Sequence, residues 1–441
     1  MDVFSPFGFS SPRITLLHDL MPTVHIETFG CQMNAADSAR LEQLLAARGY
    51  HPAESAGEAD LIVVNTCSVR EKAENRALAR IQQYCTTRKA GSHLWVIGCM
   101  AERMGERLRR RFPGIDTIIG APSMEHIAGD IDGYLQGVAI TGDEAPRRSA
   151  PVSAFVPVMR GCDNFCSYCI VPHVRGREHS VSWAELETTI GELVQRGTVE
   201  VTLLGQNVNS YCCDGMDFAG LLKRVHGIPG IKRIRFTTSH PKDFSDRLVE
   251  TIADLPGVCN HVHLPVQSGS SRILGLMKRG YDREAYLAKI DMLRRRIPEV
   301  DITTDAMVGF PTESREEFEE TCSLFQRVRF TTAFMFAYSP REGTGAFAMR
   351  DDICREEKRS RLNRLIAIQT SITKQKYGDA VGRELEVLAT ERQRRRDRHW
   401  MGSDYGCKRV LVACRDDLAG TILRVHVDES SGMTLVGRRA A

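Results

Sequence analysis

The sequence predicts an α/β protein built from three consecutive domains, and three observations lead to this prediction. Short apolar segments rich in β-branched residues alternate with amphipathic helices in a first series, and a second, longer series of the same kind follows. The chain then finishes with short strands joined by Gly and Asp turns. At 441 residues it exceeds the size of one compact core. The expected divisions are a disordered extension over residues 1–21, a first domain over 22–138, a linker over 139–150, a second domain over 151–377 and a third over 378–441.

The first domain is predicted to be an open parallel sheet covered by helices. Its strands are rich in β-branched residues and long enough for a buried parallel sheet. They read VHIETFG (24–30), DLIVVNT (60–66), HLWVIG (93–98) and TIIGAP (117–122). The segment that follows loses this periodicity and gathers Pro, Gly and charged residues, which indicates a linker.

The second domain is predicted to be a partial (βα)6 barrel. Six strand-like segments alternate strictly with helical ones, which is fewer than the eight pairs of a complete barrel. The active site is therefore expected at the carboxyl ends of the strands. The strand segments are residues 155–161, 199–205, 231–239, 260–266, 301–310 and 331–339.

The third domain is predicted to be a small β-barrel of a kind that often binds nucleic acid. Its strands are expected at residues 384–391, 409–414, 420–428 and 433–438. The basic run from Arg392 to His399 is either part of an RNA-binding surface or a solvated turn. The net charge of +3 neither requires nor excludes an anionic partner. No apolar run reaches the ~18 residues of a membrane span and no export signal is present, so we expect a cytoplasmic protein.

Three cysteines lie close together in GCDNFCSYC (161–169), with the spacing C-x3-C-x2-C. Cys162, Cys166 and Cys169 follow the first strand of the second series and are expected on a loop at its carboxyl end. A closed zinc site would need a fourth ligand, and none has a convincing spacing, although zinc or a structural role stays an alternative. A 4Fe-4S cluster held by three thiolates leaves one iron free to bind another molecule. The motif therefore predicts such a cluster.

A second trio of cysteines follows the strands of the first domain. Cys31, Cys67 and Cys99 come directly after FG, NT and IG, and parallel strands place their carboxyl ends along one edge of a sheet. A single cysteine there is usually a small buried apolar residue, but three in equivalent positions predict a second three-thiolate cluster. The remaining eight cysteines show no comparable arrangement.

The cysteine motif with Tyr168 resembles the radical S-adenosylmethionine (SAM) superfamily. The order of an N-terminal three-cysteine domain, this core and a barrel similar to the TRAM module is that of the radical SAM methylthiotransferases. Several segments are similar to the branch of the MiaB type, which acts on isopentenylated adenosine in tRNA. They are ETFGCQMN (27–34), NTCSVREKAENR (65–76), GCDNFCSYCIVPHVRGRE (161–178), LLGQNVNSY (203–211), TTSHPKDFSD (237–246), HLPVQSGS (263–270) and MKRGY (277–281).

This resemblance implies a set of SAM contacts, each of which is alternatively a rim residue without a ligand. They are Gln206 and Asn207 near the methionyl group, Gln267 and Ser268 near the ribose, Arg279 paired with the carboxylate, and Asp305 and Gly309 near the adenine.

The resemblance also implies the reaction. One SAM supplies a methyl group to sulfur associated with the second cluster, and another yields a 5′-deoxyadenosyl radical that removes hydrogen from C2 of an N6-dimethylallyl adenine at position 37, beside the anticodon. The implied partners are the anticodon stem-loop of tRNA, SAM and an electron-donor protein such as flavodoxin or ferredoxin, with the enzyme a monomer. The rival readings are a methylthiotransferase for threonylcarbamoyl adenosine or a ribosomal-protein aspartate, and a non-catalytic iron-sulfur RNA-binding sensor.

Overall fold

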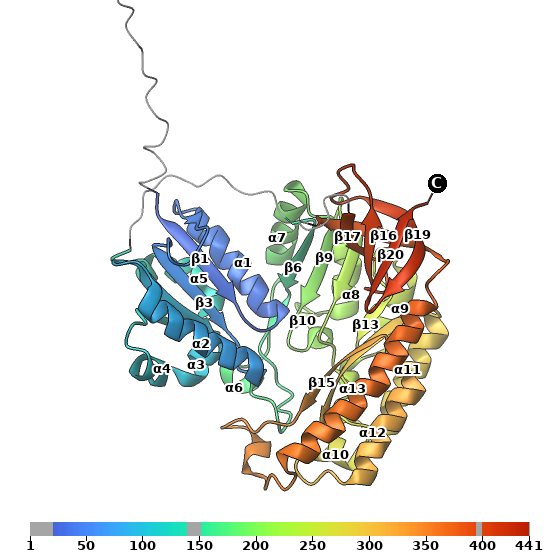
Figure 1. Cartoon of the computed structure of the whole chain (residues 1–441). Coiled ribbons are helices and arrows are strands. Elements are labelled where there is room, and N and C mark those ends of the chain that lie inside the picture. Colours follow the sequence, from blue (N-terminus) through green and yellow to red (C-terminus); the bar gives the residue numbers. More distant parts are fainter. Residues whose placement is uncertain (1–20, 139–150, 394–398, 441) are drawn as a thin grey trace, which may run out of the picture. The chain divides into compact units, whose positions relative to one another are not determined.

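The computed structural model describes residues 21–138, 151–393 and 399–440, which form two compact units, residues 1–148 and 149–441 (Figure 1). The predicted second and third domains thus lie in one unit. The expected N-terminal extension, apart from Met21, the expected linker and most of the basic run lie outside the described residues. Within the described ranges, no helix combines the length and apolar character that crossing a bilayer requires.

The N-terminal unit is a five-stranded parallel sheet with the order β2-β1-β3-β4-β5. All six residues of the central strand β3 are buried, because α1 and α5 cover one face of the sheet and α2, α3 and α4 cover the other (Figure 1). The prediction missed β2, a two-residue edge strand that contains Pro52. The elements are β1 (Thr23–Thr28), α1 (Gln32–Ala46), β2 (His51–Pro52), β3 (Leu61–Thr66), α2 (Glu71–Thr87), β4 (His93–Gly98), α3 (Cys99–Met104), α4 (Glu106–Arg111), β5 (Thr117–Gly120) and α5 (Ser123–Tyr134).

The second unit contains the predicted partial barrel of six parallel strands in chain order. The strands form two ladders of three, and the bridge between Ile234 and Val258 joins them. One apolar core lies between these strands and the helices that follow them. The strands are β6 (Ser153–Pro157), β9 (Glu200–Leu204), β12 (Arg233–Phe236), β13 (His261–His263), β14 (Asp301–Val308) and β15 (Thr332–Ala337). The helices are α7 (Trp183–Gln195), α8 (Phe218–His226), α9 (Asp246–Asp254), α10 (Ser271–Leu276), α11 (Arg283–Arg296), α12 (Arg315–Val328) and α13 (Arg355–Gly378).

Short elements decorate the loops of this partial barrel. They are β7 (Met159–Arg160), α6 (Val171–Arg175), β8 (His179–Ser180), η3 (Val208–Ser210), β10 (Cys212–Cys213), β11 (Met216–Asp217), η4 (Pro241–Asp243) and η5 (Gly345–Ala348). Of these, α6 directly follows the cysteine motif, and η3 and η4 follow β9 and β12.

The C-terminal strands close into a barrel with the order β16-β17-β18-β20-β19, as the prediction of a small barrel requires. The strands are β16 (Glu384–Arg392), β17 (His399–Ser403), β18 (Arg409–Ala413), β19 (Ile422–Ser431) and β20 (Thr434–Arg439). The prediction did not include β17. Its sequence HWMGS has little β-branched character, and its glycine is required because a Cβ on Gly402 would lie 2.4 Å from the carbonyl oxygen of Leu388.

A charged loop joins this closed barrel to the partial barrel. Residues 403–408, between β17 and β18, contact the amino-terminal ends of the strands, opposite to the cysteine motif. Arg233 donates to the carbonyl oxygen of Ser403 at 2.8 Å, and its guanidinium lies 4.4 Å from the ring centre of Tyr405. Arg235 donates to Glu200 at 2.8 Å and to the carbonyl oxygen of Asp404 at 2.5 Å.

The same loop brings a lysine to the start of β14. Lys408 pairs with Asp301 and Asp404. Burial alone would lower the pKa of Lys408, but the two carboxylates raise it above its ordinary value. This partly buried loop thus carries paired charges, and removing one partner would leave the other charge uncompensated and would destabilise the fold.

His261, at the start of β13, should make stability fall in acid. Burial, with Arg235, His263 and Lys408 nearby, lowers the pKa of His261 to about 3. Between that value and the unfolded pKa of about 6.5, the unfolded chain binds a proton that the folded chain does not, so stability falls as the pH falls. We expect His261→Asn to reduce the slope of unfolding free energy against pH by about 1.4 kcal/mol per unit in this window.

Urea unfolding of both proteins between pH 6.5 and 4 measures this slope. The exposed Thr189, changed to alanine, is the control, because its side chain does not titrate and the slope should stay unchanged. If the unfolding free energies of the wild type and of His261→Asn fell in parallel with pH, the lowered pKa assigned to His261 would be wrong.

Candidate functional site

The cysteine motif forms a tight loop after β7 at the carboxyl end of the partial barrel. The loop begins at Gly161, where φ is +73° and a Cβ would lie 1.9 Å from the carbonyl oxygen of Arg177. The backbone N–H of Cys162 donates to the carbonyl oxygen of Gly176, and that of Cys169 donates to Cys166. Only glycine permits this close approach of two chain segments.

The three thiols of this loop lie near one another. Cys162 and Cys166 are each 7% exposed, and Cys169 is partly buried. Burial raises the pKa of Cys169 to about 12, and the neighbouring sulfurs of Cys166 and Cys162 contribute to this shift. Burial likewise raises the pKa of Cys162. Ligation of iron by these side chains therefore has to release their protons.

A substitution at Gly161 tests the geometry of this loop. Gly161→Ala is expected to displace the loop and abolish iron uptake, because the added methyl group collides with the backbone. Gly176→Ala is the matched control, since φ there is +76° but no atom lies within 4 Å of a Cβ. It should cost about 1–3 kcal/mol, because φ +76° with ψ −164° is a conformation that essentially only glycine adopts, and it should retain iron. Iron counting after anaerobic reconstitution distinguishes the two, and equal iron contents would refute the argument.

Arg279 lies directly beside the cysteine loop. Its guanidinium donates to Cys166 Sγ at 3.3 Å, to the hydroxyl groups of Tyr168 at 3.3 Å and Tyr281 at 3.0 Å, and to the carbonyl oxygen of Pro265 at 3.1 Å. The side chain is 5% exposed. Most of its donors are thus already used within the protein.

The ends of β9 and β12 carry four buried polar atoms that have no hydrogen-bond partner among the described residues. Asn207, Ser239 and His240 are at most 6% exposed. Such atoms are costly unless something pairs with them, and they therefore indicate a ligand site. The atoms are Gln206 Oε1, Asn207 Oδ1, Ser239 Oγ and His240 Nε2.

Hydrogen bonds hold these two strand ends together and define the state of His240. Asn207 Nδ2 donates to Asp243 at 2.7 Å, and the N–H of His240 donates to Asn209 Oδ1 at 2.7 Å. His240 Nδ1 accepts from the N–H of Lys242, so Nε2 carries the proton. Burial, aided by Arg279 and Lys242, lowers the pKa of His240 to about 2. The ring is thus a neutral donor at physiological pH.

Sequence reasoning placed Gln206 and Asn207 in this group but did not single out Ser239 and His240. The signal was present, because Ser239 ends and His240 directly follows a strand segment of the second series, in the segment TTSHPKDFSD.

The other predicted SAM contacts fall into two groups. Gln267 adopts a φ of +71°, donates its N–H to the carbonyl oxygen of Asp305 and thereby extends the β14 pairing. Ser268 is fully buried, and its hydroxyl accepts from the N–H of Ser270. A Cβ on Gly309 would lie 2.5 Å from Lys358 Cγ, so this glycine packs against α13. Gln267 and Asp305 are therefore adjacent, whereas Ser268 and Gly309 contact other protein residues, and their part in binding SAM stays a prediction.

The second cysteine trio lies at the carboxyl ends of three neighbouring strands in the N-terminal unit. Cys31 is the N-cap of α1 and follows β1, Cys67 follows β3, and Cys99 begins α3 after β4. A Cβ on Gly30 would lie 2.6 Å from Cys67 Cβ, which shows how closely the first two loops approach. Burial raises the pKa of Cys67, and the nearby Cys31 raises it further. The sheet order reverses between β1 and β3, where open α/β sheets bind ligands.

Neither trio has the geometry of a single-ion site. Within the described residues, no three His, Cys, Asp or Glu side chains are grouped so as to hold one metal ion. Four thiolates on one zinc ion would lie only about 4 Å apart, whereas each thiolate of a 4Fe-4S cluster binds a different iron and needs more space. The all-sulfur donor sets, each with two buried cysteines and one partly buried cysteine, therefore fit a cluster.

Comparison with known proteins agrees with this arrangement. Residues 23–120 match the model described as uncharacterized protein family UPF0004, and residues 156–325 match the radical SAM superfamily. The fold is similar to that of the radical S-adenosylmethionine methyltransferase TsrM from Kitasatospora setae, with a TM-score of 0.54 and 13% identity, covering 79% of this chain and 91% of that one.

Curated relatives match the chain over nearly its whole length. A protein of Moorella thermoacetica is 42% identical over 94% of this chain and 98% of its own. One of Chlorobaculum tepidum is 44% identical over 94% of this chain and 97% of its own. Both are named tRNA-2-methylthio-N(6)-dimethylallyladenosine synthase. With this identity, and with a radical SAM core that carries the three-cysteine loop, the chain belongs to the tRNA-2-methylthio-N(6)-dimethylallyladenosine synthase family of radical SAM enzymes.

Proposed function

We propose that this protein transfers a methylthio group to C2 of N6-dimethylallyl adenosine at position 37 of tRNA, next to the anticodon. The observation that carries the proposal is the C-x3-C-x2-C loop, with Cys162 and Cys166 buried, at the carboxyl end of a six-stranded partial barrel, in a chain 40–44% identical to relatives named for this reaction. An aromatic C–H bond of this kind is not removed by a general base at neutral pH, which is why such a reaction needs radical chemistry.

Two 4Fe-4S clusters are assigned to the two cysteine trios. Cys162, Cys166 and Cys169 would hold the cluster that binds and reductively cleaves SAM, and Cys31, Cys67 and Cys99 would hold the auxiliary cluster. Each trio supplies three thiolates, so each cluster keeps one iron open to a further ligand. In the N-terminal unit, Cys31 is the N-cap of α1 and Cys99 begins α3.

The unpartnered atoms at the ends of β9 and β12 suit the amino-acid part of SAM. Gln206 Oε1, Asn207 Oδ1 and Ser239 Oγ are acceptors for an ammonium group, and the N–H of His240 is a donor for a carboxylate. Gln267 and Asp305, whose main chains are paired, are assigned to the nucleoside part. Ser268 and Gly309 support this site through packing.

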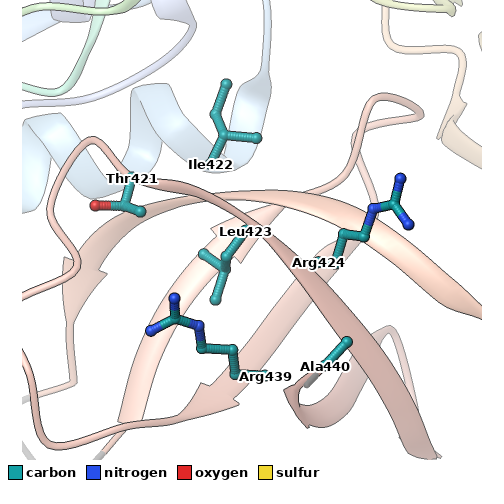
Figure 2. A pocket seen from close by; sticks show the side chains of 6 residues that line it. All are labelled: Thr421, Ile422, Leu423, Arg424, Arg439 and Ala440. Atoms are coloured by element: carbon teal, nitrogen blue, oxygen red, sulfur yellow. The ribbon is translucent and has the colours of Figure 1, made fainter.

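The closed barrel supplies a surface for the RNA backbone. A surface pocket is lined by Thr421, Ile422, Leu423, Arg424, Arg439 and Ala440 (Figure 2). Neither guanidinium has an ion-pair partner in the described part of the chain, and phosphate groups are the natural partners of free arginines. We assign the other partners as an electron-donor protein such as flavodoxin or ferredoxin, with the enzyme a cytoplasmic monomer.

The decisive experiment incubates the reconstituted enzyme with SAM, a reductant and either isopentenylated or unmodified tRNA. Nucleoside mass spectrometry should show the methylthio product only with isopentenylated tRNA. A product on threonylcarbamoyl adenosine or on a ribosomal-protein aspartate would replace the proposed substrate. RNA binding without 5′-deoxyadenosine would identify a non-catalytic sensor.

A further inference from the structure

Among the described residues, the buried guanidinium of Arg279 has no carboxylate partner. Its contacts among the described residues are Cys166 Sγ, two tyrosine hydroxyl groups and one carbonyl oxygen. A buried cation is costly unless an anion compensates it. Of these four partners, only the cysteine becomes an anion when it ligates iron, so the compensating charge has to come from the ligated loop.

The backbone around Arg279 is shaped to present this side chain to the cysteine loop. The residues on either side, Lys278 and Gly280, have φ values of +56° and +72°, which turn the chain sharply after α10. Ser167 then joins the loop to this turn, because its N–H donates to the carbonyl oxygen of Met277 and its hydroxyl donates to that of Leu276. A left-handed lysine is unfavourable and persists only where the surroundings impose it.

Arg279 has little capacity left for a second anion. A guanidinium has five N–H groups, and Arg279 makes four contacts within the protein, to Cys166, Tyr168, Tyr281 and Pro265. Binding the SAM carboxylate through a two-pronged contact would require breaking at least one of them. The unpartnered His240 Nε2 has no such conflict.

We propose that Arg279 is a positioning residue for the SAM-cleaving cluster, acting on the cluster through Cys166, and is not the residue that binds the SAM carboxylate. This inference rests on the proposed assignment of a cluster to Cys162, Cys166 and Cys169. A hydrogen bond to a ligating sulfur and a fixed positive charge beside it both stabilise the more negative, reduced form of an iron-sulfur cluster. Arg279 therefore raises the reduction potential of this cluster and makes electron transfer to it easier.

The test uses the full chain carrying Cys31→Ala, so that only the cluster on the second unit contributes to the signal. Reduction is followed by electron paramagnetic resonance in a potentiometric titration, and SAM affinity is measured separately by equilibrium binding. Arg279→Gln is expected to keep its iron, to shift the midpoint potential to a more negative value and to change the SAM dissociation constant by less than about threefold. Arg279→Lys keeps the positive charge, so its midpoint potential should lie between that of the parent protein and that of Arg279→Gln.

Arg272→Gln is the matched control, because this arginine lies on α10, directly before the turn that carries Arg279, but is half exposed and pairs with Glu317. It should leave both the midpoint and the SAM affinity unchanged. If Arg279→Gln fails to hold iron, the comparison of Arg279→Lys with the parent protein decides the question by the same two measurements.

An unchanged midpoint with SAM affinity weakened by about tenfold or more would overturn the inference and make Arg279 the carboxylate contact. Failure of the proposed function looks different. In that case the parent protein itself takes up no cluster, whatever residue stands at position 279.

Discussion

Cys162→Ala is expected to abolish both 5′-deoxyadenosine formation and methylthio transfer, whereas Cys31→Ala is expected to abolish the transfer and retain SAM cleavage. The two cysteines follow β7 in the second unit and β1 in the N-terminal unit, so each substitution removes a ligand from a different proposed cluster. Anaerobic reconstitution should give about eight irons in the wild type and about four in each variant. Iron analysis combined with chromatography of 5′-deoxyadenosine and of tRNA nucleosides measures all three quantities.

Cys322→Ala is the control for this pair. Cys322 is also buried in the second unit, on α12, but it lies outside both trios. It should retain the full iron content and both activities. The two-cluster assignment would be wrong if Cys31→Ala kept the full iron content, or if Cys162→Ala still cleaved SAM.

Arg235→Met is expected to destabilise the second unit by about 3–5 kcal/mol, because it leaves the carboxylate of Glu200 buried without its partner. The side chains of Arg235 and Glu200 are 7% and 5% exposed, and the same guanidinium binds the loop of the closed barrel. Arg383→Met is the matched control. It breaks another Arg–Glu pair, with Glu299, whose side chains are 56% and 75% exposed, and such pairs contribute at most about 1 kcal/mol.

Differential scanning calorimetry of the full, metal-free chain compares the two variants under identical conditions. A large shift should occur in the transition of the second unit for Arg235→Met only. Equal shifts for both variants would mean that the charged loop between β17 and β18 does not hold the two barrels together.

Local sequence pattern was sufficient for most of the fold. Continuous β-branched runs predicted β3 and β4 correctly, since a strand covered on both faces needs apolar residues at every position. Regular alternation of strands and helices predicted the partial barrel. The pattern failed for β2 and β17, which are short and contain proline or glycine, because pairing with neighbouring strands, and not intrinsic propensity, makes these segments extended.

The sequence by itself determined which residues are proposed as iron ligands, because the spacing of Cys162, Cys166 and Cys169 and the strand-end positions of Cys31, Cys67 and Cys99 are properties of the chain order. Only the tertiary structure decided what surrounds them. Arg279 meets Cys166 across 113 residues of sequence, and Arg235 meets Asp404 across 169. The partner of a buried charge is set by packing between distant segments, and no local periodicity carries that information.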